Sequence, residues 1–360
     1  MHEMSIIQQV VNSLNSELSA EEKYQVSNII LHLGELSNVQ PILLENAFKA
    51  YQEASADYVH TRLTVLQIPV VIHCDQCGED SRVKQYVFKC NNCGKPSTNL
   101  ISGEELLIHK IEFFDPFKLQ LKNMIQLSQQ RTSKNKRGTI NCDNTTRHLL
   151  QANDFVAEAI RNKMLQSKTL VINIVSSAGS GKTTLMIETG KRLKEKYSIK
   201  VLVGDLETER DADRIKAAGV DALQIVTGGI CHLEAQMVWQ AMETMDLTGT
   251  DLLFIENVGN LVCPASFDLG EDYRVTLIAS TEGDDKPKKY PRMFLTSELM
   301  IVSKADLLPY VPFSVEEVTK DARDINHELE VITISSIKGD GIEEWCQWLE
   351  ERIALKRQIV

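Results

Sequence analysis

Two pairs of cysteines form the most specific chemical pattern in the chain. Cys74 and Cys77 make up one Cys-x-x-Cys pair, and Cys90 and Cys93 make up a second after twelve intervening residues. Four thiolates from two tight turns suit tetrahedral Zn²⁺, and four protein ligands leave no open position for a substrate. We therefore expect a structural zinc site, with free cysteines in a hydrophobic core as the alternative.

A glycine-rich loop with a lysine follows a hydrophobic stretch. Residues 173–184, Asn-Ile-Val-Ser-Ser-Ala-Gly-Ser-Gly-Lys-Thr-Thr, close a predicted strand and open a predicted helix, as a phosphate-binding P-loop requires. Lys182 would reach the β- and γ-phosphates, and the Thr183 hydroxyl would bind Mg²⁺. Ser176 replaces the first glycine of the general pattern. The predicted phosphate-binding residues are Gly179, Ser180, Gly181, Lys182, Thr183 and Thr184.

A second motif predicts which base the nucleotide carries. Residues 303–306, Ser-Lys-Ala-Asp, follow an apolar strand and resemble the guanine-reading Asn-Lys-x-Asp motif. A carboxylate that accepts hydrogen bonds from two N–H groups of guanine would reject adenine, so Asp306 favours GTP. Lys304 matches the lysine of the motif. Ser303 replaces the asparagine with a shorter side chain, which weakens one expected contact with the nucleotide. Ser335 ends the next predicted strand and is expected to back the base.

Acidic residues follow two of the predicted strands. Glu256 ends the strand at 252–255 and would act on Mg²⁺ through water or on the attacking water, while Gly259 would let the backbone approach the γ-phosphate. Asp205 follows the strand at 200–203 and is the candidate second Mg²⁺ ligand beside Thr183. We therefore predict Lys182, Asp205 and Glu256 as catalytic residues. The nearby acids Glu207, Asp211 and Asp213 are either further candidates or solvated loop charges.

Three further residues could bind a metal ion. Cys231 and His232 are adjacent in the sequence, and Cys263 lies seven residues beyond Glu256. Cysteine and histidine together suit Zn²⁺ or Ni²⁺, and three ligands leave room for a second chain, water or a transferred ligand. Because Cys263 follows the segment expected to sense the γ-phosphate, nucleotide state could alter metal affinity. Spacing alone also fits buried structural cysteines.

The N-terminus offers a third set of ligands. The Met1 amine, the His2 imidazole and the intervening backbone nitrogen can chelate one ion, and nitrogen-rich tetragonal sites favour Ni²⁺ or Cu²⁺. Considered alone, a histidine at position 2 is more typical of an ordinary surface residue.

Length and composition bound the class of protein. The 360 residues predict two domains, and the formal charge of −11 argues against nucleic-acid binding. No apolar run is long enough to span a membrane and no signal peptide is evident, so we expect a cytoplasmic protein without membrane attachment. Eight cysteines are too few for a disulfide scaffold.

The elements that must position these residues fall into two patterns. Apolar residues at helical spacing over 6–14, a helix over 39–54 and an extended run over 63–73 predict a small α+β domain with an inserted zinc ribbon. After residue 141, β-branched runs alternate with helical stretches, which predicts an α/β P-loop domain whose mostly parallel sheet is flanked by helices. The predicted strands are 170–175, 200–203, 252–255, 276–279, 299–302 and 331–334. The predicted domains are 1–116 and 141–360, joined by a basic linker at 117–140.

The first domain resembles the HypA family of nickel chaperones over residues 1–116. The resemblance rests on Met-His-Glu-Met-Ser at 1–5, Gly-Glu-Leu-Ser-Asn-Val at 34–39, the double cysteine pair and Ser-Gly-Glu-Glu-Leu at 102–106. It implies that His2 and the Met1 amine bind nickel, that Glu3 tunes this site, and that the four paired cysteines hold zinc.

The second domain resembles the HypB GTPases over residues 145–355. The similar segments are 205–215, 231–235, 255–265, 268–271 and 282–291, whereas Ala178 stands where the family usually has proline. The resemblance implies service in [NiFe]-hydrogenase maturation, a nucleotide-dependent homodimer, and Ni²⁺ or Zn²⁺ at Cys231, His232 and Cys263 near the dimer interface.

Together these patterns predict a GTP-dependent nickel chaperone that delivers Ni²⁺ to the hydrogenase large-subunit precursor, with other maturation proteins as further partners. The expected ligands are GTP or GDP, Mg²⁺, Zn²⁺ and Ni²⁺. Hydrolysis should be slow, because the sequence marks no arginine finger. The alternatives are nickel delivery to another enzyme such as urease, and a zinc-regulated GTPase or metal-storage protein.

Overall fold

The computed structural model describes residues 2–37, 39–55, 57–114, 151–205, 210–228 and 230–358. Contacts divide these residues into two compact units: one from the ranges Met1–Val70 and Ser102–Leu149, the other from Val71–Ile101 and Leu150–Val360. The predicted linker at 117–140 lies outside the described residues. The predicted domain limits remain a prediction.

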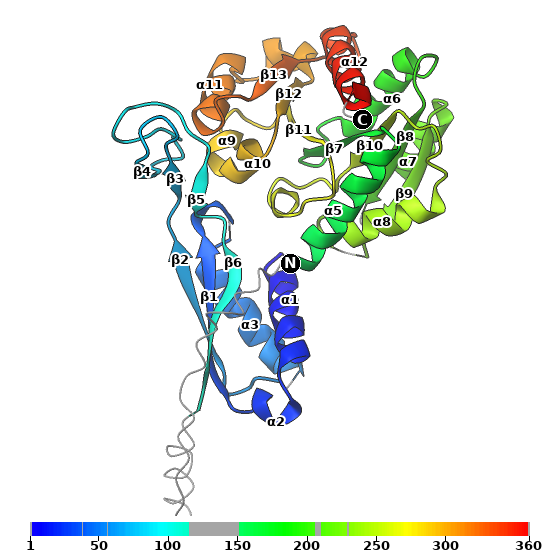
Figure 1. The fold of residues 1–360 in the computed structure, drawn as a ribbon. Helices are drawn as coiled ribbons and strands as arrows, with labels where there is room; N and C mark the ends of the chain where they lie inside the picture. The colour runs from blue at the N-terminus through cyan, green and yellow to red at the C-terminus, as the bar shows by residue number, and fades with distance from the viewer. Residues whose placement is uncertain are drawn as a thin grey trace, which may run out of the picture. The chain divides into compact units, whose positions relative to one another are not determined.

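The first unit is built on a three-stranded sheet with the order β2-β1-β6. The central strand β1 (Val26–Gly34) pairs in parallel with β2 (Arg62–Ile68) and antiparallel with β6 (Leu106–Phe113). Helices α1 (His2–Glu17) and α3 (Pro41–Ser55) lie on one face of this sheet (Figure 1). A short helix α2 (Ala20–Lys23) and a 3-10 turn η1 (Glu35–Ser37) complete the connections.

Alternation along β1 explains why one sheet face carries the core of this unit. Ile29, Leu31 and Leu33 are fully buried, and they cluster with the apolar stripe of α1. That stripe is Ile6, Ile7, Val10, Val11 and Leu14, whose three- and four-residue spacing indicated the helix. The intervening residues of β1 point to the other face of the sheet.

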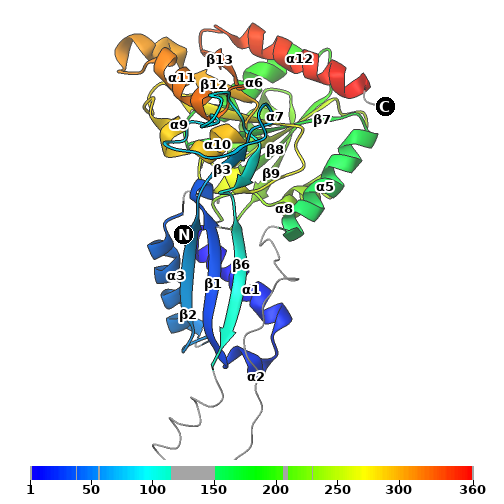
Figure 2. The same cartoon turned by 60° about the vertical axis from the view of Figure 1, so that its left-hand side comes forward.

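The second unit contains a seven-stranded sheet in which every strand pair is parallel (Figure 2). Its order is β13-β12-β11-β7-β10-β8-β9. The strands are β7 (Leu170–Ser176), β8 (Ile199–Asp205), β9 (Asp221–Val226), β10 (Leu252–Glu256), β11 (Tyr273–Ala279), β12 (Leu299–Ser303) and β13 (Glu330–Thr333).

Helices cover both faces of this sheet. Ile172 and Phe254 belong to a core with α6 (Lys182–Leu193), α7 (Arg210–Ala217) and α12 (Ile342–Gln358). Their strand neighbours Val171 and Leu253 belong to a second core with α5 (Gln151–Gln166) and α8 (Ala235–Thr244). Because successive side chains enter opposite cores, the strands are buried on both faces. The predicted α/β fold is confirmed.

Shorter elements finish the second unit. They are the helices α9 (Lys286–Lys289), α10 (Pro291–Leu295) and α11 (Val315–Ile325), with the 3-10 helices η2 (Cys263–Ser266) and η3 (Ala305–Tyr310). The cysteine pairs lie in the segments that connect the strands of a small sheet, β3 (Val71–His73), β4 (Asp80–Arg82) and β5 (Leu100–Ser102), whose order is β4-β3-β5. Among the described helices, none is both long enough and apolar enough to cross a membrane.

Candidate nucleotide and metal sites

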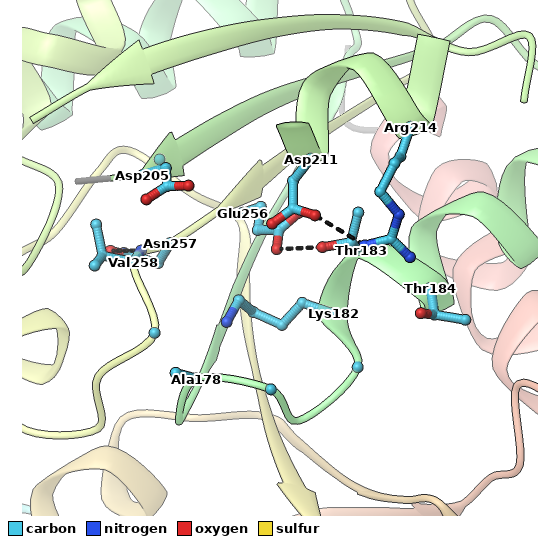
Figure 3. Close-up of a pocket in the computed structure, with 14 residues that line it drawn as sticks. Ala178, Lys182, Thr183, Thr184, Asp205, Asp211, Arg214, Glu256, Asn257 and Val258 are labelled. Carbon is cyan, nitrogen blue, oxygen red and sulfur yellow. Dashed lines mark hydrogen bonds and ion pairs between the residues drawn. The ribbon is translucent and has the colours of Figure 1, made fainter. Parts of the chain in front are cut away.

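The P-loop lies between β7 and α6, as the sequence predicts. Gly179 and Gly181 have φ angles of 74° and 101°, values that favour glycine, and Gly181 is the N-cap of α6. A cavity of about 420 Å³ opens beside the loop at the carboxyl ends of the strands (Figure 3). It is lined by Ala178, Gly179, Gly181, Lys182, Thr183, Thr184, Gly204, Asp205, Asp211, Arg214, Glu256, Asn257, Val258 and Gly259.

Lys182, Thr183 and Glu256 converge in this cavity. The Thr183 hydroxyl donates a hydrogen bond of 3.0 Å to Glu256 Oε1, and Lys182 Nζ donates one of 2.9 Å to Ser176 Oγ. Burial raises the pKa of Glu256 to about 7, against the opposing influence of Lys182 and Thr183. Burial also lowers the pKa of Lys182, which the charge of Glu256 opposes. Inside the cavity, Lys182 therefore loses its proton, and Glu256 keeps its proton, at pH values unusual for these side chains.

The acidic side chains fit a magnesium ion. Glu256 Oε2 is buried and has no hydrogen-bond partner among the described residues, so an acceptor is left for water or a cation. Asp205 and Asp211 also line the cavity, and the carboxylates of all three suit a hard divalent ion. Glu207 lies outside the described residues, and Asp213 does not line the cavity.

Arg214 is a cavity residue that the sequence reasoning missed. It extends from α7 and donates a hydrogen bond of 2.9 Å to Asp211 Oδ1 (Figure 3). Its three-residue spacing from Asp211 on a helix was the available indication, since such pairs lie on one helix face. The cavity thus holds a second basic side chain besides Lys182.

The predicted guanine-reading residues also converge. Asp306 Oδ1 accepts a hydrogen bond of 2.7 Å from Ser335 Oγ, and this bond lowers the pKa of Asp306. Lys304 adopts a left-handed conformation with φ of 57°. Ser303 does not reach toward a base: its hydroxyl donates to the backbone oxygen of Ser180 at 2.7 Å. The serine that departs from the motif therefore ties β12 to the P-loop.

Gly259 brings the loop after β10 against the P-loop. A Cβ atom at this position would lie 2.7 Å from Ala178 Cα, inside the contact distance of two carbons. Glycine is therefore required at position 259 for the two loops to come this close. The sequence also predicted a close approach at Gly259, but to the γ-phosphate of the nucleotide. Asn260 follows, and its side-chain amide donates to Cys263 Sγ at 2.8 Å and to the Cys231 carbonyl at 3.4 Å.

Cys231, His232 and Cys263 come together next to this loop. Their ligand atoms all lie within 4.8 Å of one another. Cys231 Sγ lies 2.6 Å from Cys263 Sγ and 3.9 Å from His232 Nδ1. The other ring nitrogen of His232 faces Glu234 at 3.6 Å, and the ring stacks on Phe267 with centroids 3.9 Å apart.

The ligand atoms of these three residues are of the types that bind transition-metal ions. Thiolates and an imidazole suit Zn²⁺ or Ni²⁺, although two sulfurs bound to one zinc lie about 3.8 Å apart and must separate on binding. The hydrogen bond with Cys231 and burial raise the pKa of Cys263. Burial acts to lower the pKa of His232, but its contacts with Cys231 and Glu234 prevail and raise it.

The four paired cysteines also cluster. Cys74 Sγ lies 3.5 Å from Cys93 Sγ, and Cys77 Sγ lies 3.6 Å from Cys90 Sγ. These separations are close to those of a tetrahedral ZnS₄ centre, so the residues fit structural zinc. The backbone N–H of Cys93 and the hydroxyl of Ser81 lower the pKa of Cys90 to about 6.

Each Cys-x-x-Cys turn ends on a glycine. Gly78 and Gly94 have φ angles of 73° and 69°, as a tight turn around sulfur requires. The predicted N-terminal nickel site is different, because Met1 and the side chain of His2 lie outside the described residues. Glu3 is in the first turn of α1 and is partly buried.

Comparison with known proteins identifies both halves of the chain. Residues 1–113 match the family described as "Hydrogenase/urease nickel incorporation, metallochaperone, hypA", and residues 170–333 match "CobW/HypB/UreG, nucleotide-binding domain". The hydrogenase maturation factor HypB of Escherichia coli K12 is 50% identical over 202 residues, which are 56% of this chain and 70% of that protein. The chain belongs to the HypB family. It fuses a HypA domain to the HypB nucleotide-binding domain.

Two further proteins show how widely the HypB match extends. The hydrogenase/urease maturation factor HypB of Helicobacter hepaticus is 42% identical over 214 residues, covering 58% of this chain and 88% of that protein. The crystal structure of HypB from Helicobacter pylori in complex with nickel matches with a TM-score of 0.55 and 40% identity. That match covers 57% of this chain and 96% of the other. The chain is therefore related to nickel-dependent hydrogenase maturation.

Proposed function

We propose that this chain is a GTP-dependent nickel chaperone that captures Ni²⁺ and delivers it to the large-subunit precursor of a [NiFe]-hydrogenase. One observation supports the proposal most directly. A single segment, residues 256–263, carries a cavity acid at one end and a metal-site thiol at the other. If bound nucleotide displaces this segment, the position of Cys263 relative to the other metal ligands changes.

The contacts along this segment supply the coupling. Glu256 bonds to the P-loop threonine, Gly259 packs against Ala178, and Asn260 donates to Cys263 Sγ. Two arrangements of this segment, selected by GTP or GDP, would give two positions of one ligand relative to Cys231 and His232. A difference of that kind is what links two binding sites thermodynamically.

The cavity residues support GTP hydrolysis as the reaction. Lys182 would bind the β- and γ-phosphates, Thr183 and Asp205 would hold Mg²⁺, and Glu256 would orient the attacking water at Oε2. The metal, when bound, neutralises charge on the phosphate oxygens. Asp306, supported by Ser335, would select guanine. We expect slow turnover without a partner.

The remaining assignments follow from family membership and donor chemistry. Nickel would be captured at Met1, His2 and Glu3, passed to or through the Cys231 site, and released to the precursor. Zinc would be held by the four paired cysteines. A second copy of the chain would bind through the nucleotide-binding domain, within the cytoplasm and with other maturation proteins. We propose domain limits of 1–116 and 141–360.

Urease is a second candidate recipient of the nickel. The matching family description and the Helicobacter hepaticus relative both name urease beside hydrogenase. The alternative of a zinc-regulated GTPase or storage protein remains distinguishable by experiment, because it requires no nickel transfer.

Complementation tests the proposal. A strain that lacks its own copy of this gene would express wild type, Lys182→Ala, or the control Lys194→Ala, which removes an exposed lysine just after α6. We expect hydrogenase activity and nickel content to be restored by wild type and control but not by Lys182→Ala. Restored urease with inactive hydrogenase would favour the second recipient. Full activity with Lys182→Ala would contradict a nucleotide-driven mechanism.

A further inference from the structure

Two histidines lie face to face on the sheet of the first unit. His32 is on β1 and His109 is on β6, and their ring centroids are 3.9 Å apart with an interplanar angle of 12°. His109 is exposed and His32 is half-buried. The ring of His32 is therefore partly enclosed by its neighbours, whereas the ring of His109 faces solvent.

The strand register explains how the two rings meet. Leu31 pairs with Ile108, whereas Ile30 pairs with Lys110, so His109 is the additional residue of a β-bulge. Ile108 and Ile111 on either side of the bulge pack against the core. His109 and Lys110 therefore both project from the opposite face, which is the face of His32.

Helices α1 and α3 pack on the core side of the sheet (Figure 1). Leu66 of β2, which pairs with His32, is 44% exposed. Lys110 is the nearest cation in sequence, and its amino group bonds Glu112 Oε1 at 2.8 Å. The negative charge of Glu105 acts on His32. The surroundings thus favour a bound cation.

We propose that His32 and His109 form a bis-imidazole site for a divalent transition-metal ion, with Glu105 adding negative charge and water completing the coordination. Imidazole nitrogen favours Ni²⁺, Cu²⁺ and Zn²⁺ over the oxygen-seeking Mg²⁺ and Ca²⁺. The other three ligand sets proposed above use different residues, so this pair would be a separate site.

Coordination requires the stacked rings to open, because the nitrogen lone pairs of parallel rings run parallel and do not converge. The movement falls on His109, whose exposed side chain can change rotamer without disturbing the core. Burial and the neighbouring His109 lower the pKa of His32, which keeps its ring in the neutral form that metals bind.

Nickel binding to the full-length chain tests this site. A background with His2→Ala, Cys231→Ser and Cys263→Ser removes at least one ligand from each of the other proposed nickel sites, and the zinc ribbon is kept loaded. Into this background we would place His109→Asn, His32→Asn, or His60→Asn, an exposed histidine of the same unit as control. Equilibrium dialysis with Ni²⁺, and separately with Zn²⁺, would measure stoichiometry and affinity.

We expect one bound ion in the background and in His60→Asn, and affinity at least about tenfold weaker in each of the other variants, since even changes outside the ligand shell cost about ten- to a hundredfold. Paramagnetic Ni²⁺ should broaden the imidazole signals of His32 and His109 first. Unchanged binding in His109→Asn would overturn the proposal and leave the pair as a structural stack. Because the readout is direct binding without nucleotide, this result is independent of the proposed chaperone function.

Discussion

Replacement of Glu256 by glutamine should change how the stability of the nucleotide-binding domain depends on pH. The side chain is 4% exposed, and burial raises its pKa from 4.5 to about 7. In the unfolded chain the carboxyl ionises near 4.5, while in the folded protein it keeps its proton until about pH 7. The contribution of this group to stability is therefore complete below pH 4.5 and is lost as the pH rises through about 7.

The size of the effect follows from the two pKa values. A rise from 4.5 to about 7 corresponds to about 3 kcal/mol at 1.36 kcal/mol per pH unit. Glutamine cannot ionise but keeps an acceptor oxygen for Thr183. We therefore expect the free energy of unfolding of Glu256→Gln, relative to wild type, to increase by about 3 kcal/mol between pH 4.5 and pH 8.

Urea unfolding in EDTA, without nucleotide, would measure this difference. All three tryptophans lie within the second unit, so their fluorescence reports its unfolding. Glu195→Gln, which alters an exposed carboxylate after α6, is the matched control and should follow the wild-type pH profile. Parallel profiles for Glu256→Gln and wild type would refute the argument that burial of Glu256 governs its proton affinity.

Three further changes test other parts of the structure. Ser303→Ala removes the hydroxyl that bonds the P-loop and should weaken GDP binding by about fivefold, which corresponds to about 1 kcal/mol, in a fluorescent-nucleotide titration; equal affinity of variant and wild type would show that this hydrogen bond does not support nucleotide binding. Arg274→Met leaves the carboxylate of Glu271 buried without its partner at 2.7 Å and should lower the free energy of unfolding by about 3–5 kcal/mol in urea; a loss below 1 kcal/mol would show that the pair is dispensable. Cys90→Ser should lower the zinc content by one ion per chain by elemental analysis, whereas Cys346→Ser, outside both clusters, should retain it.

The sequence predicted six of the seven strands of the large sheet. Strands β7 and β10 are buried along their whole length and are mostly apolar, which is typical of parallel strands covered on both faces. Strand β9, at one edge of the sheet, was missed, because only two of its six residues are buried and its sequence, Asp-Ala-Leu-Gln-Ile-Val, forms no continuous apolar run. Strand β1 was also missed, since Ile30 and Leu31 side by side obscure its alternation. The order of the strands depends on crossovers that no local pattern records.

The candidate-site residues could be predicted where all of them lie within one short segment of the sequence. The P-loop and the two Cys-x-x-Cys turns belong to this class, and the structure brings their predicted residues together. The bond from Ser303 to the P-loop joins residues 123 positions apart, and serine at that position suggested only a shortened contact. Asn260 was missed as a donor to Cys263 because an asparagine in a loop has many possible roles.

The central claim is that nucleotide bound beside Glu256 alters metal binding at Cys263. Ni²⁺ titration of the zinc-loaded chain, with GDP or with a non-hydrolysable GTP analogue, measures this coupling directly when wild type is compared with Cys263→Ala and His2→Ala. We predict that one nickel-binding event is lost in each variant, and that only the event dependent on Cys263 changes affinity between the two nucleotides. Equal nickel affinity with GDP and the GTP analogue in the wild type would contradict the proposed control of nickel transfer by GTP.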